Sequence, residues 1–139
     1  MKELATIHFD GGGQSPGLTA ACIVELSDGS VVQAVRCFDQ GTHNIAEYQA
    51  LILGLRLALD HGERHVVVKG DSRLVVRQVN GDWKTKNPAL RSLRTQAKEL
   101  LDLFESWDVK WIQRKENWRA DRLGRGEMSL GPRVSIDGH

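Results

Sequence analysis

Short runs of β-branched and apolar residues alternate along the chain with longer stretches of helix-forming residues. The runs at 4–10, 19–26 and 31–38 favour strands, and the turn sequence Ser27-Asp28-Gly29-Ser30 joins the second run to the third. Three consecutive glycines at 11–13 close the first run. The first part of the chain is therefore predicted to form a strand followed by a hairpin.

The rest of the chain is predicted to form helices separated by two further strands. Val66-Val67-Val68 is an uninterrupted β-branched run, as in a central strand covered on both faces. Asn44, and Asn87 followed by Pro88, are placed as helix caps. We expect helices at 44–60, 72–80, 88–104 and 117–125, and strands at 66–70 and 108–113. This order of elements predicts an α/β protein with a mixed sheet flanked by helices.

The chain has 139 residues, enough for one domain with a single hydrophobic core. No repeat or linker divides it, and residues 127–139 show no apolar period, so we expect an irregular or flexible tail after a folded unit at 1–126. No run of about 18 apolar residues occurs, and the N-terminus lacks the regions of a signal peptide. We therefore expect a soluble, cytoplasmic protein with no membrane contact, acting as a monomer.

The two cysteines, Cys22 and Cys37, have neither the CxxC spacing nor the nearby histidines of a zinc site. We interpret both as reduced thiols in the core. They lie on the two strands of the predicted hairpin, so a diagonal disulfide is the alternative.

The formal net charge of +1 hides an uneven distribution. Residues 1–63 carry 3 basic and 8 acidic side chains, whereas residues 64–126 carry 15 basic and 8 acidic ones. A basic second half indicates a polyanionic partner, while a solvated helix face is the alternative explanation.

Two aspartates come at the ends of apolar strands. Asp10 and Asp71 follow the first and the fourth predicted strand, and the helix between these strands forms a crossover that would make them parallel neighbours. Their carboxylates would then meet at one edge of the sheet. Each aspartate taken alone is better explained as a turn-forming or capping residue, and it is their pairing that favours a shared site.

Two further acidic residues stand on helices. Glu47 is placed in the first turn of the long helix, on a face with Ala50, Gly54 and Ala58 that can lie close to the sheet. A glutamate on a packing face needs a partner or a metal ion, although the helix dipole also favours glutamate in a first turn. Asp121 is either a metal ligand or a helix-start carboxylate. A cluster with oxygen ligands alone favours Mg²⁺ or Mn²⁺ over zinc.

Four segments resemble the active-site segments of the type 1 ribonuclease H family, in order and at fitting spacing. They are FDGGG at 9–13, THNIAEYQALILGL at 42–55, GDS at 70–72 and ENWRAD at 116–121. The resemblance covers residues 4 to about 125. It implies the ribonuclease H-like fold, a five-stranded mixed sheet with the first three strands antiparallel, and hydrolysis of the RNA strand of RNA/DNA hybrids by a catalytic domain at 1–126.

The resemblance assigns the four carboxylates to two Mg²⁺ ions, which Mn²⁺ is expected to replace. It implies that Asp10 bridges both ions and that Asp121 helps to hold the one that activates water. Glu47 and Asp71 would hold the ion at the leaving 3′ oxygen, whose developing charge that ion neutralises. The expected products carry 5′-phosphate and 3′-hydroxyl ends.

Further residues are candidates for holding the hybrid. The glycines at 11–13 leave room for a nucleic-acid backbone, with a tight turn as the alternative. In the family the THN-like segment touches both strands, although family members commonly have asparagine at the position of His43. Asn44 and Gln78 are candidates for recognising the 2′-hydroxyl. The alternative for Asn44 is a helix cap, and the alternative for Gln78 is an exposed helix residue. Trp83 is a candidate for contacting the DNA strand, with core packing as the alternative. The expected substrate-binding residues are Gly11, Gly12, Gly13, Thr42, His43, Asn44, Ser72, Gln78, Trp83, Lys84, Lys86 and Asn117.

Two features of some relatives are missing from this compact form. Only GDWKTKNP separates the helix near 80 from the helix at 88, which leaves no room for the basic protrusion that grips substrate in those relatives. The connection before the last helix lacks the histidine that many ribonucleases H carry, so we expect chemistry that does not depend on imidazole. Four arginines are candidates for replacing part of this protrusion: Arg73, Arg77, Arg91 and Arg94. The alternative is that they are solvated surface charges.

Three other functions remain as alternatives. A DNA nuclease, resolvase or integrase of the same superfamily is disfavoured by the THN-like segment. A non-catalytic hybrid-binding module is disfavoured because all four carboxylates are present. A reverse-transcriptase fragment is disfavoured because Met1 lies just before the first predicted strand.

Overall fold

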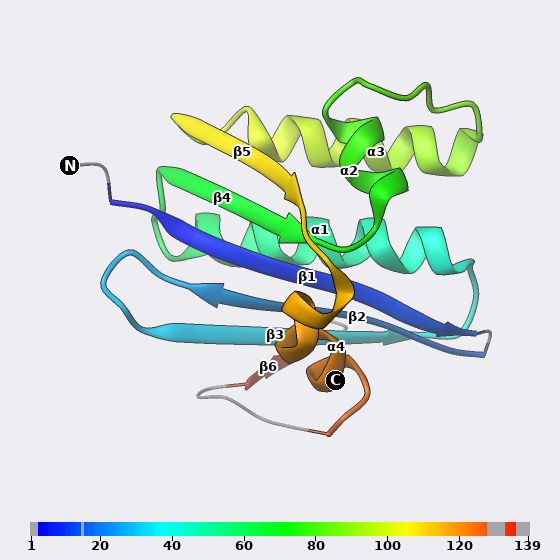
Figure 1. Cartoon of the computed structure of the whole chain (residues 1–139), viewed down its shortest axis with the longest axis horizontal. Helices are drawn as coiled ribbons and strands as arrows, with labels where there is room; N and C mark the ends of the chain where they lie inside the picture. Colours follow the sequence, from blue (N-terminus) through cyan, green and yellow to red (C-terminus); the bar gives the residue numbers. More distant parts are fainter. Residues whose placement is uncertain (1–2, 15, 128–132, 136–139) are drawn as a thin grey trace.

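The computed structural model describes residues 3–14, 16–127 and 133–135 (Figure 1). Its strands are β1 (Ala5–Gln14), β2 (Gly17–Glu25), β3 (Val31–Phe38), β4 (His65–Gly70), β5 (Ser106–Trp111) and β6 (Arg133–Ser135). Its helices are α1 (His43–Asp60), α2 (Arg73–Val79), α3 (Pro88–Leu101) and α4 (Trp118–Gly124), with the 3₁₀ turn η1 (Arg114–Asn117) before α4. None of the helices in these ranges combines the length and the hydropathy needed to cross a membrane.

All strands belong to one mixed sheet with the order β5-β4-β1-β2-β3-β6. β1, β2 and β3 pair antiparallel, whereas β4 runs parallel to β1 and β5 runs parallel to β4. The fold class predicted from the sequence, with its five-stranded mixed sheet and antiparallel first three strands, is confirmed.

The sixth strand was not predicted. β6 pairs in parallel with residues 33–35 of β3, so the expectation of a wholly irregular tail at 127–139 is wrong for residues 133–135. The free edge of β3 offers unpaired backbone groups, and three residues are enough to use them although they are too few to show a periodic pattern. Residues 128–132 and 136–139 lie outside the described part of the chain.

The helices form two unequal layers on the sheet. α1, α2 and α3 cover one face, and the short α4 covers part of the other (Figure 1). α1 has 11 buried residues among 18, so it packs on several sides and not along a single stripe. It lies close to β1 because position 54 is glycine: a Cβ there would stand 2.6 Å from Cγ2 of Ile7. The main core therefore lies between α1 and the sheet.

Several element ends differ from the prediction. α1 begins at His43, and its N-cap is Thr42, whose hydroxyl accepts the N–H of Ile45 at 3.2 Å. Asn44, expected as the cap, lies inside the first turn. β1 does not end before the glycines but continues to Gln14, because residues 11–13 stay paired with β2. A local sequence pattern does not show which of two neighbouring polar residues, Thr42 or Asn44, caps the helix. It also does not show that a run of glycines stays paired within a sheet.

The hairpin between β2 and β3 is confirmed at the predicted turn. The Leu26 N–H donates to the Ser30 carbonyl at 2.8 Å, and Gly29 has φ 90°, a conformation that favours glycine. Cys22 is buried opposite Ala34, whereas Cys37 is exposed, and both thiols are free. The interpretation of Cys37 as a core thiol is wrong. It lies an odd number of residues from Ala34 on the same strand, so the two cysteines occupy opposite faces of the sheet.

Candidate active site

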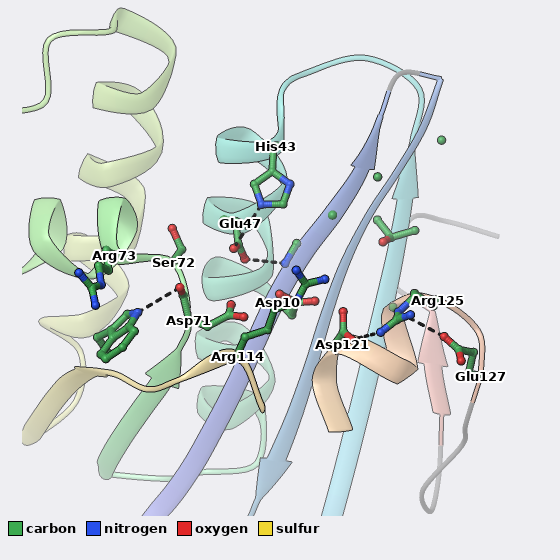
Figure 2. A pocket seen from close by; sticks show the side chains of 17 residues that line it. Asp10, His43, Glu47, Asp71, Ser72, Arg73, Arg114, Asp121, Arg125 and Glu127 are labelled. Atoms are coloured by element: carbon green, nitrogen blue, oxygen red, sulfur yellow. Dashed lines mark hydrogen bonds and ion pairs between the residues drawn. The ribbon is translucent and has the colours of Figure 1, made fainter. Parts of the chain in front are cut away.

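Asp10 and Asp71 lie at the same edge of the sheet because β1 and β4 are parallel neighbours. The register pairs Phe9 with Gly70, the residues that precede the two aspartates. Glu47 of α1 approaches from the covered face of the sheet. Each of the three side chains offers a carboxylate oxygen, and these oxygens lie within 4.8 Å of one another. Three carboxyl groups therefore converge from two strand ends and one helix (Figure 2).

Glu47 is held in place by the backbone beside Asp10. Its Oε1 accepts the N–H of Gly11 at 2.6 Å, and the residue is only 3% exposed. This contact depends on glycine, because a Cβ at position 11 would lie 2.2 Å from the backbone carbon of Ala46. Glu47 is the fifth residue of α1, so its placement in the first turn was wrong. The dipole at the helix start thus does not explain why a glutamate is buried here.

Asp121 joins the cluster from the other side of the sheet. It lies in the first turn of α4, and its carboxyl group is close enough to that of Asp10 to help raise the pKa of Asp10. The guanidinium of Arg125, one turn further along, pairs with Asp121, and its Nε lies 3.2 Å from Oε2 of Glu127. Asp10 therefore stands between Asp121 on one side and the pair of Glu47 and Asp71 on the other (Figure 2).

The acidic groups raise one another's proton affinity. Burial, followed by the charges of Glu47, Asp71 and Asp121, raises the pKa of Asp10 to about 9. Burial also raises the pKa of Glu47, against the bonds from His43 and Gly11 that favour its charged form. A site that gathers this much negative charge and offers only carboxylate oxygens fits a hard divalent cation such as Mg²⁺ or Mn²⁺.

An imidazole does reach the cluster, from an element other than the one considered in the sequence. Nε2 of His43, the first residue of α1, lies 3.7 Å from Oε2 of Glu47. This contact raises the pKa of His43 above its ordinary value, although partial burial acts in the opposite direction. The expectation that the chemistry does not depend on imidazole considered only the connection before the last helix, and it stays a prediction, because a contact between His43 and Glu47 does not test it.

The carboxylates form the floor of an open groove with a volume of about 1080 Å³. Its walls include residues that the sequence analysis had not assigned to the site, namely Gly17, Thr19, Trp111, Arg114, Gly124, Arg125 and Glu127. For Trp111 a usable signal existed. It ends β5, the parallel neighbour of β4, and therefore had to emerge at the same edge as Asp71. The groove-facing direction of Arg114 and Arg125 depends on η1 and α4 packing and gave no such signal.

Comparisons with known proteins show the family of this chain. A family model described as reverse transcriptase-like matches residues 8–125. Ribonuclease HI of Halobacterium salinarum is 38% identical over 119 residues, which are 84% of this chain and 60% of that protein. The crystal structure of RNase H1 from the same archaeon superimposes with a TM-score of 0.83 at 34% identity, covering 89% of this chain and 96% of that one. The chain belongs to the type 1 ribonuclease H family.

Two further ribonuclease H structures are similar. The N-terminal RNase H domain of a Mycobacterium tuberculosis protein, solved as a fusion, gives a TM-score of 0.84 at 34% identity, covering 91% of this chain and 94% of that one. LC11-RNase H1, solved in complex with an RNA/DNA hybrid, gives 0.79 at 27% identity, with coverages of 88% and 94%. The chain spans 60% of the curated archaeal relative's length and 35% of the bifunctional mycobacterial protein's length.

In this member of the ribonuclease H family, the predicted substrate-binding residues divide into three groups. Those that line the groove with the carboxylates are Gly11, Gly12, Gly13, His43 and Ser72. Trp83, Lys84 and Lys86 lie outside it as exposed residues of the loop between α2 and α3. Trp83 is 48% exposed, so the alternative of a core tryptophan is wrong.

The remaining predicted residues do not line the groove. Gln78 is buried, and its Oε1 accepts the Tyr48 hydroxyl at 2.7 Å, so it is not the exposed helix residue considered as the alternative. Asn117 is buried beneath the site and donates to the Phe9 carbonyl at 2.8 Å, next to Asp10. Thr42 caps α1 and Asn44 lies in its first turn. The structure thus brings neither amide, Gln78 nor Asn117, to the groove.

Proposed function

We propose that this chain is a metal-dependent endonuclease that hydrolyses the RNA strand of RNA/DNA hybrids and leaves 5′-phosphate and 3′-hydroxyl ends. One observation carries the proposal: Asp10, Glu47 and Asp71 offer carboxylate oxygens within 4.8 Å of one another on the floor of an open groove. A structural role does not explain this arrangement, because like charges at this distance destabilise the folded protein unless a cation joins them.

The proposal assigns the four carboxylates to two divalent cations. Asp10 stands between the other groups and would contact both ions, with Asp121 on one side and the pair of Glu47 and Asp71 on the other. Bound Mg²⁺, or Mn²⁺ in its place, supplies an activated water and neutralises charge on the leaving oxygen. The chain's own part is to fix the ligands. The Gly11 N–H orients Glu47, and Asn117 holds the Phe9 carbonyl beside Asp10.

The groove and the family both support the proposed substrate class. LC11-RNase H1, which has a similar fold, was solved in complex with an RNA/DNA hybrid. Here the groove is open and glycine-lined next to Asp10, which allows a sugar-phosphate backbone to approach the carboxylates. Lys84 and Lys86 are exposed on the loop after α2 and would meet the uncut DNA strand. We further propose that the protein acts as a monomer in the cytoplasm.

The deciding experiment compares four labelled substrates of one sequence: RNA/DNA, RNA/RNA, DNA/DNA and single-stranded RNA. We expect Mg²⁺-dependent cutting of the RNA strand of the hybrid, abolished by a chelator. A ligase should rejoin the fragments without further treatment, because they carry 5′-phosphate and 3′-hydroxyl ends. Equal cutting of the DNA duplex would indicate a DNA nuclease of the same fold. Cutting that survives the chelator would contradict the metal-dependent mechanism.

A further inference from the structure

Trp111 contacts the backbone of Asp71 through its indole nitrogen. The Nε1–H donates to the Asp71 carbonyl at 3.1 Å, which the close-up view shows as a dashed line (Figure 2). The backbone next to the ring is also held in place. Trp111 is the last residue of β5, and the N–H of the next residue, Ile112, donates to the Gly70 carbonyl at 2.9 Å. Two bonds, one from the last residue of β5 and one from the residue after it, therefore hold the carbonyl groups of Gly70 and Asp71 at the end of β4.

An arginine side chain stacks on the same indole ring. The guanidinium carbon of Arg73 lies 4.4 Å from the centre of the Trp111 ring, and both side chains line the groove. No ion pair joins Arg73 to a carboxylate within the described part of the chain. A guanidinium stacked on an aromatic face keeps the N–H groups along its edge available for a planar, bidentate partner such as a phosphate.

Helix stability does not account for an arginine at this position. Arg73 is the first residue of α2, and a positive charge at a helix N-terminus opposes the helix dipole. Trp111 is likewise 36% exposed, more than a purely structural indole requires. A cation held on an exposed ring beside an acidic cluster has a clear use in binding a polyanion, because the carboxylates themselves repel phosphates.

We propose that Trp111 is a positioning residue that orients Asp71 for metal binding, and that Arg73, held on the Trp111 ring, binds a phosphate of the cleaved strand next to the scissile one. The proposal rests on the proposed function and deepens it. Because the guanidinium is ordered before substrate arrives, less conformational entropy is lost on binding. The two roles use different parts of one side chain, the N–H and the ring face, so they can be separated by substitution.

Trp111→Phe keeps an aromatic face for Arg73 and removes the N–H. We expect its apparent Mg²⁺ dissociation constant, measured from the Mg²⁺-dependent rise in melting temperature, to increase about tenfold, the lower end of effects for groups that orient metal ligands. At saturating Mg²⁺, kcat should recover to the wild-type value. Trp118→Phe is the matched control, since Trp118 also stacks on an arginine, Arg122 at 5.5 Å, but does not line the groove.

Arg73→Ala removes the phosphate contact and leaves the indole in place. We expect KM for the hybrid to rise about tenfold with kcat nearly unchanged, and the salt dependence of binding to lose about one unit of slope. Arg73→Lys keeps the charge without the planar fork, so it should keep the slope and recover only part of the affinity. Arg56→Ala, an exposed arginine of α1 away from the groove, controls for a general loss of positive charge.

Each part of the proposal has its own contrary result. Wild-type Mg²⁺ affinity in a folded Trp111→Phe protein would overturn the positioning role, and this measurement needs no cleavage activity. An unchanged KM and salt slope in Arg73→Ala would overturn the phosphate contact. Failure of the wild-type protein to cut any hybrid would instead contradict the proposed function, which the Mg²⁺ melting experiment does not test.

Discussion

Asp10 is partly buried among three other carboxylates, and its chemistry follows from that position. Burial and the neighbouring charges raise its pKa from 3.8 to about 9, so at neutral pH the metal-free protein keeps a proton on it. A bound cation would replace that proton. Substitution of Asp10 can therefore be followed by two measurements: the cleavage rate with metal present and the stability of the metal-free protein.

The first prediction concerns stability without metal. The folded-state pKa of Asp10 is above the unfolded value, so the folded protein holds the extra proton between about pH 4 and pH 9. Its stability contribution is then lost as pH rises through this window. Asp10→Asn should remove the loss and stabilise the metal-free protein at pH 7 by on the order of 1–3 kcal/mol, roughly 3–10 °C in melting temperature.

The measurement is a series of thermal melts in chelator between pH 4 and pH 9. The wild-type melting temperature should fall more steeply with pH than that of Asp10→Asn, and Mg²⁺ should reduce the difference. Asp60→Asn, which removes an exposed carboxylate at the end of α1, is the control and should follow the wild type. Parallel curves for the wild type and Asp10→Asn would contradict the raised pKa.

The second prediction concerns the carboxylates in catalysis. Asp10→Asn and Asp71→Asn should abolish cleavage, by about 10³-fold or more, which corresponds to about 4 kcal/mol in the barrier, because both groups belong to the carboxylate cluster that is proposed to bind the metal ions. Asp121→Asn should retain more activity and be partly rescued by Mn²⁺, since an amide oxygen still coordinates. Single-turnover rates on folded variants test this, and substantial activity in Asp71→Asn would exclude the proposed two-metal site.

At the scale of elements, the sequence predicts which strands and helices form better than it predicts which way single side chains point. The apolar patterns were sufficient for β1 to β5 and for the four helices, and the crossover through α1 correctly brought Asp10 and Asp71 to one edge. The direction of Gln78 was not predictable, because its burial depends on how α2 packs against Tyr48 of α1. Arg114 and Arg125 were missed for the same reason: they reach the groove through tertiary packing, which no local pattern records.

The third prediction tests the close contact between β1 and α1. Gly11→Ala would place a Cβ 2.2–2.4 Å from the backbone of Ala46 and Glu47, so the helix must move and Glu47 with it. We expect a loss of about 1–3 kcal/mol in stability together with weaker Mg²⁺ binding. Gly12→Ala is the control, since a Cβ at position 12 meets nothing within 4 Å. Equal unfolding free energies for the two variants would contradict this account of the contact.

The fourth prediction concerns the loop between α2 and α3. Its backbone is held by side chains of both helices: Nε2 of Gln78 donates to the Lys84 carbonyl at 3.4 Å, and Nε of Arg91 donates to the Thr85 carbonyl at 3.2 Å. Replacing Lys84 and Lys86 by alanine should therefore leave the loop in place and remove two charges. We expect a higher KM, a nearly unchanged kcat and a flatter salt dependence. An unchanged salt slope would place the DNA strand elsewhere.

At the scale of the whole molecule, the chain separates its charges by function. The groove floor is acidic, while Arg73 of α2, Arg114 of η1 and Arg125 after α4 line the groove, and Lys84 and Lys86 of the loop after α2 lie outside it. The arginines that line the groove all come from the basic second half of the sequence, whereas the carboxylates come from both halves, Asp10 and Glu47 from the first and Asp71 and Asp121 from the second. The interpretation of the basic half as a polyanion-binding surface stays a prediction, which the salt-dependence measurements test.

The last prediction concerns the C-terminal segment. β6 extends the sheet at β3, on the far side from β4 and β5, and its pairing with residues 33–35 protects a strand edge. Truncation after Glu127 keeps the ion pair between Arg125 and Glu127 and removes β6. We expect a melting temperature lower by a few degrees, since three paired residues contribute little, and a kcat within about tenfold of the full chain. Val134→Pro, which removes one backbone donor without shortening the chain, should reproduce part of the stability loss. If the truncated protein stays folded but loses more than about tenfold in kcat, a barrier change of about 1.4 kcal/mol, the segment after Glu127 serves the chemical step and its assignment to the sheet edge alone is wrong.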